Sequence, residues 1–175
     1  MCQAESVAAM GGNVNLLCVP THARITVNVH INEWHSTHRA PPGYRIAFLL
    51  ERFTGHWDDL ASHEVLGVST WGRPVARAED QVTTLEHTRM ALSPAAPKNS
   101  ASWFIAANRR WIRTHMPEIH RLISYVDESH HTGVTYRADN WQVVYRRRRS
   151  SHTWGNRSGR SGEKADLRTK FERVP

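Results

Sequence analysis

Long hydrophobic runs are absent from this sequence. No apolar stretch approaches the roughly 20 residues that a helix needs to cross a bilayer, so we expect no transmembrane span and no membrane partner. The first 20 residues, MCQAESVAAMGGNVNLLCVP, also lack the positively charged start of a secretory signal. We therefore expect a protein that is neither inserted into a membrane nor exported.

Cysteine is scarce as well. Only Cys2 and Cys18 occur, and both lie in the poorly patterned first 23 residues. Small secreted domains that depend on disulfides carry more cysteines, at regular spacings. The sequence therefore favours two free thiols in a reducing compartment over a disulfide.

Acidic residues are few at the C-terminal end, where the excess positive charge is concentrated. Residues 146–175 hold ten of the 23 Lys and Arg but only three of the 16 Asp and Glu, so the net charge of +7 arises there. A localised basic segment predicts a polyanionic partner such as nucleic acid. The alternative is a solvated tail without a partner. Trp154 and Phe171 favour a partner, because aromatic rings among basic residues can stack on bases or anchor the tail.

The spacing of apolar residues predicts the main elements. In RITVNVHI the apolar residues at 25, 27, 29 and 31 alternate with polar ones, which is the pattern of a half-buried strand. A helical pattern begins at Ser100 or Ser102, either of which can act as the N-cap, and ends before Pro117. In chain order we expect strands at 25–31, 44–53, 64–72, 82–92, 121–126 and 141–145, helices at 100–116 and 132–140, and a short helical or irregular connection at 32–43.

This order of elements predicts the fold class. Antiparallel strands followed by a strand–helix–strand crossover imply an α/β (α+β) domain, with a mixed, mostly antiparallel sheet and helices on both faces. We expect the strands at 44–53 and 64–72 to form a hairpin. The chain divides into a poorly patterned N-terminal segment (1–23), a folded catalytic domain (24–145) and a basic C-terminal tail (146–175).

Three stretches carry a resemblance to a known family. The order of elements is similar to that of the GNAT acyltransferases. NSASWFIAANRRWI, LISYVDESHHTGVTYRADNWQVVY and the arginine-rich tail resemble the phage Mom proteins, over residues from about 30 to 160. The resemblance implies conversion of adenine in DNA to an N6-carbamoylmethyl form that blocks host restriction. It also implies double-stranded DNA as partner and the cytoplasm of the infected bacterial host as location, and a homodimer is compatible with it.

The resemblance to the GNAT acyltransferases implies acetyl-CoA or a related acyl-CoA as cofactor. The usual phosphate-binding loop, Arg/Gln-x-x-Gly-x-Gly/Ala, is missing, and SPAAPKNSAS occupies its position. Phosphate groups bind well at helix N-termini, where backbone N–H groups are free. The predicted cofactor site is therefore Lys98, Asn99, Ser100 and Ser102, at the start of the predicted helix.

Catalytic candidates lie around the segment 122–141. Tyr136 matches the tyrosine that serves as general acid in the GNAT acyltransferases, and a phenol that is neutral at pH 7 can donate a proton. Without the resemblance a packing role would be favoured. Asp127 ends a predicted buried strand, where open sheets bind ligands, but capping the following turn is an equal alternative. Ser124 is predicted to hydrogen-bond the base or the cofactor, with burial in the core as the alternative.

Histidines supply further candidates. His35 and His38 are three residues apart and share one face if their segment is helical. They could serve as a base or as metal ligands, and the resemblance to the Mom proteins implies iron as a candidate cofactor. Two histidines without a nearby carboxylate are weak evidence for a metal. We therefore predict His35 as a site residue, with Trp34 beside it, and expect His130 and His131 to be exposed.

Chemistry on adenine N6 requires that the base leave the duplex or that the strands open. Trp34, Trp71 and Trp141 are candidates to stack on the base, although most tryptophans will lie in the core. The basic tail is expected to contact DNA phosphates through Arg146, Arg147, Arg148, Arg149, Arg157 and Arg160. Two other functions stay open: a non-catalytic nucleic-acid-binding module, and an acetyltransferase for a small amine or a protein.

Overall fold

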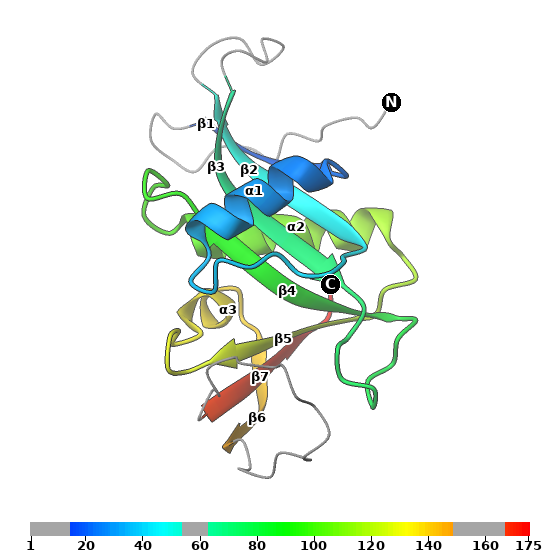
Figure 1. The fold of residues 1–175 in the computed structure, drawn as a ribbon. Coiled ribbons are helices and arrows are strands. Elements are labelled where there is room, and N and C mark those ends of the chain that lie inside the picture. The colour runs from blue at the N-terminus through cyan, green and yellow to red at the C-terminus, as the bar shows by residue number, and fades with distance from the viewer. Residues whose placement is uncertain (1–14, 54–62, 149–166) are drawn as a thin grey trace.

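The computed structural model of the chain describes residues 15–53, 63–148 and 167–175 (Figure 1). Ten helices and strands follow one another within these residues. They are β1 (Asn15–Thr21), α1 (Arg24–Trp34), β2 (Ile46–Phe53), β3 (His63–Gly72), β4 (Thr84–Leu92), α2 (Ser100–His115), β5 (Arg121–Asp127), α3 (Val134–Ala138), β6 (Gln142–Arg148) and β7 (Leu167–Arg173).

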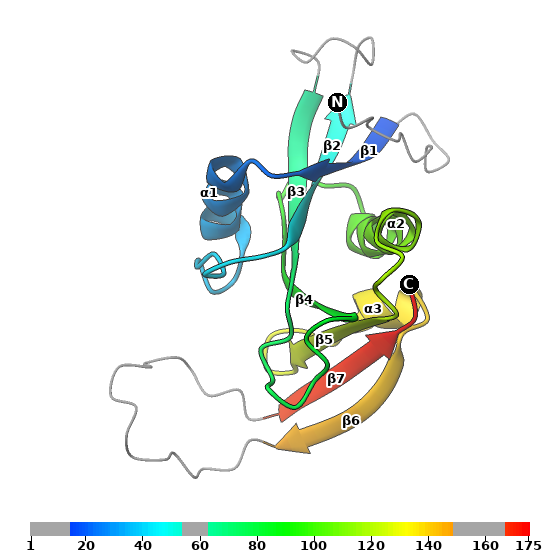
Figure 2. The same cartoon turned by 90° about the vertical axis from the view of Figure 1, so that its right-hand side faces the viewer.

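One sheet of seven strands organises the described residues, in the order β1-β2-β3-β4-β5-β7-β6. All neighbouring strands are antiparallel except β4 and β5, which run parallel. Helix α1 covers one face of the sheet and α2 the other (Figure 2). The predicted fold class, a mixed and mostly antiparallel sheet with helices on both faces, is confirmed.

The parallel pair β4 and β5 separates part of the way along its length. Backbone pairing begins at Thr84 and ends where His87 lies opposite Ser124. Strand β4 nevertheless continues to Leu92, paired with β3, and β5 continues to Asp127, paired with β7. The sheet is therefore split between its two halves beyond His87, and this split positions the site.

The segment predicted as the first strand is a helix instead. Residues 25–31 lie within α1, and the prediction of a strand there is wrong. Val27 and Ile31 are four residues apart, a spacing that fits one face of a helix as well as one face of a strand. Both are fully buried against the sheet, whereas Ile25 and Val29 are exposed. Packing on the sheet thus outweighs the local strand preference of β-branched residues.

Two strands are not predicted by the sequence pattern. Strand β1 lies at one edge of the sheet, which explains how it accommodates Pro20, a residue without a backbone donor. Its Cys18 is buried as a free thiol, and burial raises its pKa to about 12. Strand β7 lies within the basic segment 146–175 and inserts between β5 and β6, where Phe171 is fully buried in the core. Cys2 and Trp154 lie outside the described residues.

The remaining element predictions are confirmed. Strands β2 to β6 occupy the predicted positions, β2 and β3 form the predicted antiparallel pair, and α2 and α3 lie within the predicted helical segments. Helix α2 buries Phe104, Ile105 and Ile112 in the larger of two apolar cores, which also contains Trp71. No helix in the described part of the chain is long and apolar enough to span a membrane.

Candidate active site

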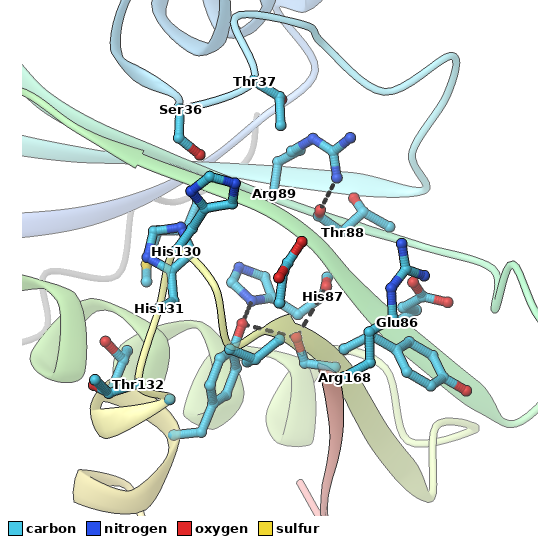
Figure 3. Close-up of a pocket in the computed structure, with 18 of the residues that line it drawn as sticks. Ser36, Thr37, Glu86, His87, Thr88, Arg89, His130, His131, Thr132 and Arg168 are labelled. Atoms are coloured by element: carbon cyan, nitrogen blue, oxygen red, sulfur yellow. Dashed lines mark hydrogen bonds between the residues drawn. The ribbon is translucent and has the colours of Figure 1, made fainter. Parts of the chain in front are cut away.

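A cavity of about 890 Å³ opens where β4 and β5 separate. Most of its wall comes from the chain after α1, strand β4, strand β5, and the turn that leads into α3, and the loop before β4, α3, β6 and β7 complete it. Figure 3 shows Glu86 to Arg89 of β4 along one wall, with the loop residues His130 and His131 beside them. Segments far apart in the sequence thus meet at the split in the sheet.

The Tyr136 hydroxyl lies at the last paired position of β4 and β5. It is 2.7 Å from Nδ1 of His87 and 2.8 Å from Oγ of Ser124, the two residues that face each other across the strands. Burial raises the pKa of Tyr136 to about 12, so the phenol is neutral at pH 7. The predicted candidates Tyr136 and Ser124 are brought together, and both line the cavity.

Close packing holds Tyr136 in place. Its ring stacks on Phe171 of β7, with the centroids 5.1 Å apart, and meets Trp141 edge-on at 5.2 Å. Gly133 begins α3 with a φ of +71°, and a Cβ there would stand 2.6 Å from the Phe171 ring. Only glycine satisfies both the backbone angle and the close approach. Glycine at 133 therefore allows α3 to bring Tyr136 against the strand.

An ion pair fixes the other end of α3. The Asp139 carboxylate accepts two hydrogen bonds from the Arg109 guanidinium of α2, at 2.9 and 3.1 Å. It also accepts one from the Trp141 indole N–H at 3.0 Å, and the Arg173 guanidinium binds the Asp139 carbonyl oxygen. These contacts tie α3 to α2 and to β7, so the position of Tyr136 depends on three elements.

His87 is a site residue that the sequence pattern does not reveal. Its ring is buried, with Nδ1 on the Tyr136 hydroxyl and Nε2 3.1 Å from Oγ of Ser69 on β3. Burial lowers the pKa of His87 to about 3; the charges of His35 and Arg89 lower it further, and a hydrogen bond to the Arg89 backbone opposes this shift. His87 is therefore neutral at pH 7. In the sequence it is one histidine among twelve, on an ordinary strand.

Glu86 is a second residue that sequence reasoning misses. It is buried, lines the cavity and accepts a hydrogen bond from the backbone N–H of Val75 at 2.7 Å. Burial raises the pKa of this carboxyl, and the Val75 N–H opposes the shift. A buried carboxylate beside a cavity is a typical acid–base group, but within β4 it stands between Leu85 and His87 and carries no motif.

Asp127 ends β5 as predicted and lines the cavity. Its Oδ1 accepts hydrogen bonds from the backbone N–H of Ser129 at 3.0 Å and from the Ser129 hydroxyl at 2.6 Å. The turn-capping alternative therefore has direct geometric support, while a catalytic role stays a prediction. The same turn carries His130 and His131, which are exposed as predicted and line the cavity.

His35 follows α1 directly and also lines the cavity. Its Nδ1 accepts a hydrogen bond from the backbone N–H of Thr37 at 3.1 Å, so the neutral ring carries its hydrogen on Nε2. Burial lowers the pKa of His35 to about 4, and the nearby Arg89 charge lowers it further. The Arg89 guanidinium lines the same cavity and donates to the carbonyl oxygens of Thr88 and Arg39.

The histidines do not form a metal site. His38 has Nδ1 2.9 Å from the carbonyl oxygen of Asn32, which requires a hydrogen on Nδ1 and directs that atom away from a shared ligand position with His35. Throughout residues 15–53, 63–148 and 167–175 no group of three or more His, Cys, Asp or Glu could hold a metal ion. The residues present therefore do not fit the iron that the sequence resemblance implies.

The predicted cofactor residues lie together at the start of α2 but outside the cavity wall. Asn99 precedes the helix with a φ of 69° and no side-chain cap, and Lys98 is exposed. The Ser102 hydroxyl donates to the Asn99 carbonyl oxygen at 3.0 Å. The Ser100 hydroxyl is buried and has no hydrogen-bond partner among the described residues.

The predicted DNA-contacting arginines are only partly described. Arg146, Arg147 and Arg148 belong to β6, which is an edge strand of the sheet. The Arg146 guanidinium binds the Glu128 carboxylate, and Arg147 lies exposed with its guanidinium 5.8 Å from the ring centroid of Tyr145. The other three predicted arginines lie outside the described residues, namely Arg149, Arg157 and Arg160.

The tryptophans predicted to stack on a base differ in exposure. Trp71 is fully buried and donates its indole N–H to Asn108 at 2.9 Å, and Trp141 is buried against Tyr136. Both serve the core. Trp34 is half-buried and stacks on His30 with the centroids 4.3 Å apart. Of the three, Trp34 has the most accessible ring.

Comparison with known proteins gives a family and a fold. The model of the Mom protein family matches residues 19–171. No curated protein matches the chain significantly. Two similar solved structures are yncA of Salmonella typhimurium, assigned as an acetyltransferase (TM-score 0.60, 10% identity, 91% of this chain and 93% of that one), and an aminoglycoside 6'-acetyltransferase of type Ii (0.55, 10%, 90% and 96%). At this identity the structures establish the fold alone.

Proposed function

This chain belongs to the Mom protein family, and on that basis we propose that it is a transferase that modifies adenine in DNA. The product is the N6-carbamoylmethyl base, which protects a phage genome from restriction in the cytoplasm of the infected host. One observation carries the proposal for this chain: a buried phenol, Tyr136, lies at the split of β4 and β5 and lines a cavity of about 890 Å³. Ligand pockets commonly have volumes of roughly 300 to 1,000 Å³.

Transfer of a group to N6 makes two demands on the site. The attacking nitrogen loses a proton as it forms a bond to the electrophilic carbon, and the leaving group gains one as its own bond breaks. Tyr136 supplies the second proton, because it is protonated at pH 7 and its hydroxyl is at the cavity wall. Glu86 accepts the first, since its raised pKa makes it a stronger base than an exposed carboxylate.

Other cavity residues bind and orient the substrate. His35 has its Nδ1 occupied by Thr37 and a pKa near 4, so it is a poor base and acts as a hydrogen-bond donor through Nε2. Arg89 donates to the backbone carbonyl oxygens of Thr88 and Arg39 and provides a positive charge at the cavity wall. Asp127 stays a predicted site residue. Its capping of the turn also holds His130 and His131 beside the cavity.

The protein holds double-stranded DNA by its phosphate backbone, and one extruded base enters the site. Within the duplex N6 is paired, so the base must be flipped out or the strands opened. Arginines on β6 and in the tail contact phosphates and set the orientation of the duplex, without reading sequence. Arg147 is the best-placed of the described arginines for this role, because Arg146 already pairs with Glu128.

An acyl-CoA thioester is the proposed cofactor. The structure of yncA, which shares the fold, was determined with acetyl-CoA. In this chain the backbone N–H groups of Ala101 and Ser102 lie at the N-terminus of α2, next to the Ser100 hydroxyl, which has no partner among the described residues, and a helix N-terminus favours a pyrophosphate. Lys98 adds an exposed cation next to them. The residues at this helix start therefore fit the pyrophosphate of this cofactor.

A thermal-shift experiment tests the cofactor. Acetyl-CoA binds only the folded state, so a hundredfold excess over its Kd should stabilise the protein by about 2.7 kcal/mol and raise Tm. Lys98→Glu should abolish this rise, whereas Lys170→Gln, which removes a buried cation of β7, should lower Tm but leave the rise intact. A calorimetric titration without any heat of binding for acetyl-CoA or CoA would exclude this cofactor.

Mass spectrometry of DNA tests the activity. Plasmid DNA from cells that express the protein should contain deoxyadenosine with the added mass of a carbamoylmethyl group, and cells without the protein should not. Unmodified DNA combined with preserved DNA binding would select the nucleic-acid-binding module instead. Unmodified DNA combined with acetylation of amines or proteins would select the ordinary acetyltransferase.

A further inference from the structure

A chain of hydrogen bonds runs through the buried end of the site. It connects Ser69 of β3, His87 of β4, Tyr136 of α3 and Ser124 of β5, with distances of 3.1, 2.7 and 2.8 Å between successive polar atoms. The Ser124 hydroxyl also lies 3.3 Å from the carbonyl oxygen of His87, which closes the chain. All four side chains are at most 9% exposed. Buried polar groups of this kind need a partner for every hydrogen.

The hydrogens can be assigned by following this requirement. In the described part of the chain, His87 Nε2 is the one hydrogen-bond partner of the Ser69 hydroxyl, so the Ser69 hydrogen goes to Nε2. A neutral imidazole then carries its own hydrogen on Nδ1, which donates to the Tyr136 oxygen. The Ser124 hydroxyl donates to the Tyr136 oxygen at 2.8 Å, so the phenol hydrogen is left for a group in the cavity. If Nε2 carried the imidazole hydrogen and donated it to Ser69, the Ser69 hydrogen would have no acceptor among these groups.

This arrangement of hydrogens defines the role of His87. We propose that His87 is the positioning residue of the site: its Nδ1–H holds the Tyr136 hydroxyl at the split of the sheet and stabilises the phenolate that forms during transfer. The proposal rests on the proposed role of Tyr136 as the acid. When the Tyr136 O–H bond breaks, the proton passes to the leaving group and the negative charge stays on the phenolate oxygen. Water returns the proton after the product leaves.

Two donors then face the phenolate oxygen. His87 Nδ1–H already points at it from 2.7 Å, and the Ser124 hydroxyl already donates to it from 2.8 Å. Pre-placed donors for a charge that develops in the transition state commonly contribute about 10² to 10³ each to the rate. Ser69 keeps the imidazole in the tautomer that makes this donation. Without Ser69, either ring nitrogen could carry the hydrogen.

Three variants of His87 separate this role from simple packing. The amide nitrogen of Asn lies near the position of Nδ1, whereas the longer side chain of Gln places its amide nearer to Nε2. We expect His87→Asn to keep modification of deoxyadenosine within about tenfold of the original rate. We expect His87→Gln and His87→Leu to lose about 10² or more, the value of one such donor. The readout is the rate at which modified deoxyadenosine accumulates in plasmid DNA after induction.

Stability and DNA binding are measured on the same variants. A structural role predicts that the loss of modification follows the loss of Tm, with no advantage for Asn over Gln. If Asn and Gln lose activity equally at equal Tm, the directional role of Nδ1 is overturned. Retained DNA binding in all three variants would show that the loss lies in the chemical step. The ionisable side chains around the His87 ring are His35, Arg89, Glu86 and Tyr136, and all four stay unchanged in these variants.

A second measurement does not depend on activity. Nitrogen NMR of the folded protein distinguishes the two tautomers of a neutral imidazole by the shifts of their ring nitrogens. The chain has twelve histidines, so the His87 signals are identified by their absence in His87→Asn. We expect a neutral ring with hydrogen on Nδ1 at pH 7, and hydrogen on Nε2 would overturn the proposal. If the unaltered protein modifies no adenine, the proposed function fails, while the NMR result still decides the arrangement of His87.

Discussion

Removal of a single oxygen tests the centre of the site. Tyr136→Phe deletes the hydroxyl that joins His87 to Ser124 but keeps the ring that stacks on Phe171. Ser124 retains the carbonyl oxygen of His87 as an acceptor, whereas the Nδ1–H of His87 is left without one in the arrangement that we infer. The fold should therefore survive with one unsatisfied buried donor.

The expected magnitudes follow from that geometry. A buried group that loses its partner costs about 1 to 3 kcal/mol, and each kcal/mol lowers Tm by about 2 to 4 °C in a protein of this length. Tm should thus fall by roughly 2 to 12 °C. Loss of a positioned proton donor should lower the rate of modification by about 10² to 10⁴. The chemical loss therefore far exceeds what a small drop in folded population can explain.

Tyr44→Phe is the matched control. The Tyr44 hydroxyl is also buried, but it has no hydrogen-bond partner among the described residues and packs in the core beneath α1. Removing an unsatisfied hydroxyl should leave Tm unchanged or higher, and modification unchanged. Both variants are assayed by accumulation of modified deoxyadenosine and by thermal melting. If Tyr136→Phe modifies adenine as fast as the unaltered protein, Tyr136 is a structural residue and the acid must be sought elsewhere.

Three further predictions concern charge. Arg147→Ala should lower the slope of log Kd for duplex DNA against log salt by about 0.9, the value of one lost phosphate contact. Arg146→Ala should change this slope less, because Arg146 pairs with Glu128. Equal slopes for both variants and the unaltered protein would exclude phosphate contacts by these arginines. Because the pKa of His87 is lowered to about 3 from 6.5, the unfolded state binds more protons between these values, so stability is present above pH 6.5 and is lost as pH falls towards 3. Urea unfolding at several pH values should show this loss, and His87→Asn should weaken it. Asp139→Asn breaks a buried bidentate ion pair with α2 and should cost about 3 to 5 kcal/mol in unfolding free energy; a change below the error of the denaturation curve would contradict the structural role of that pair.

Much of the fold follows from local patterns, and the exceptions have a common cause. The strands from β2 to β6 and the helices α2 and α3 carry periods or breakers that identify them. The prediction of a strand at 25–31 is wrong because the four-residue spacing of Val27 and Ile31 fits the period of a helix as well as that of a strand. Packing against the neighbouring sheet selects the helix. Strand β7 escapes prediction because LRTKFER is rich in charge. Its Lys170 is nevertheless buried, paired with Glu79 from the loop before β4.

The sequence by itself determined the family and the class of fold, and it predicted four residues that line the cavity, Tyr136, Ser124, Asp127 and His35, because rare residues at fixed spacing and period-two strands are local information. Only the tertiary structure decided which residues meet them. His87 and Glu86 come from a strand 37 or more residues before Ser124, and neither has a local signal. Their roles depend on where β4 and β5 stop pairing and on burial, which shifts both of their pKa values. Pairing and burial are properties of the assembled sheet, so no stretch of the chain contains them alone.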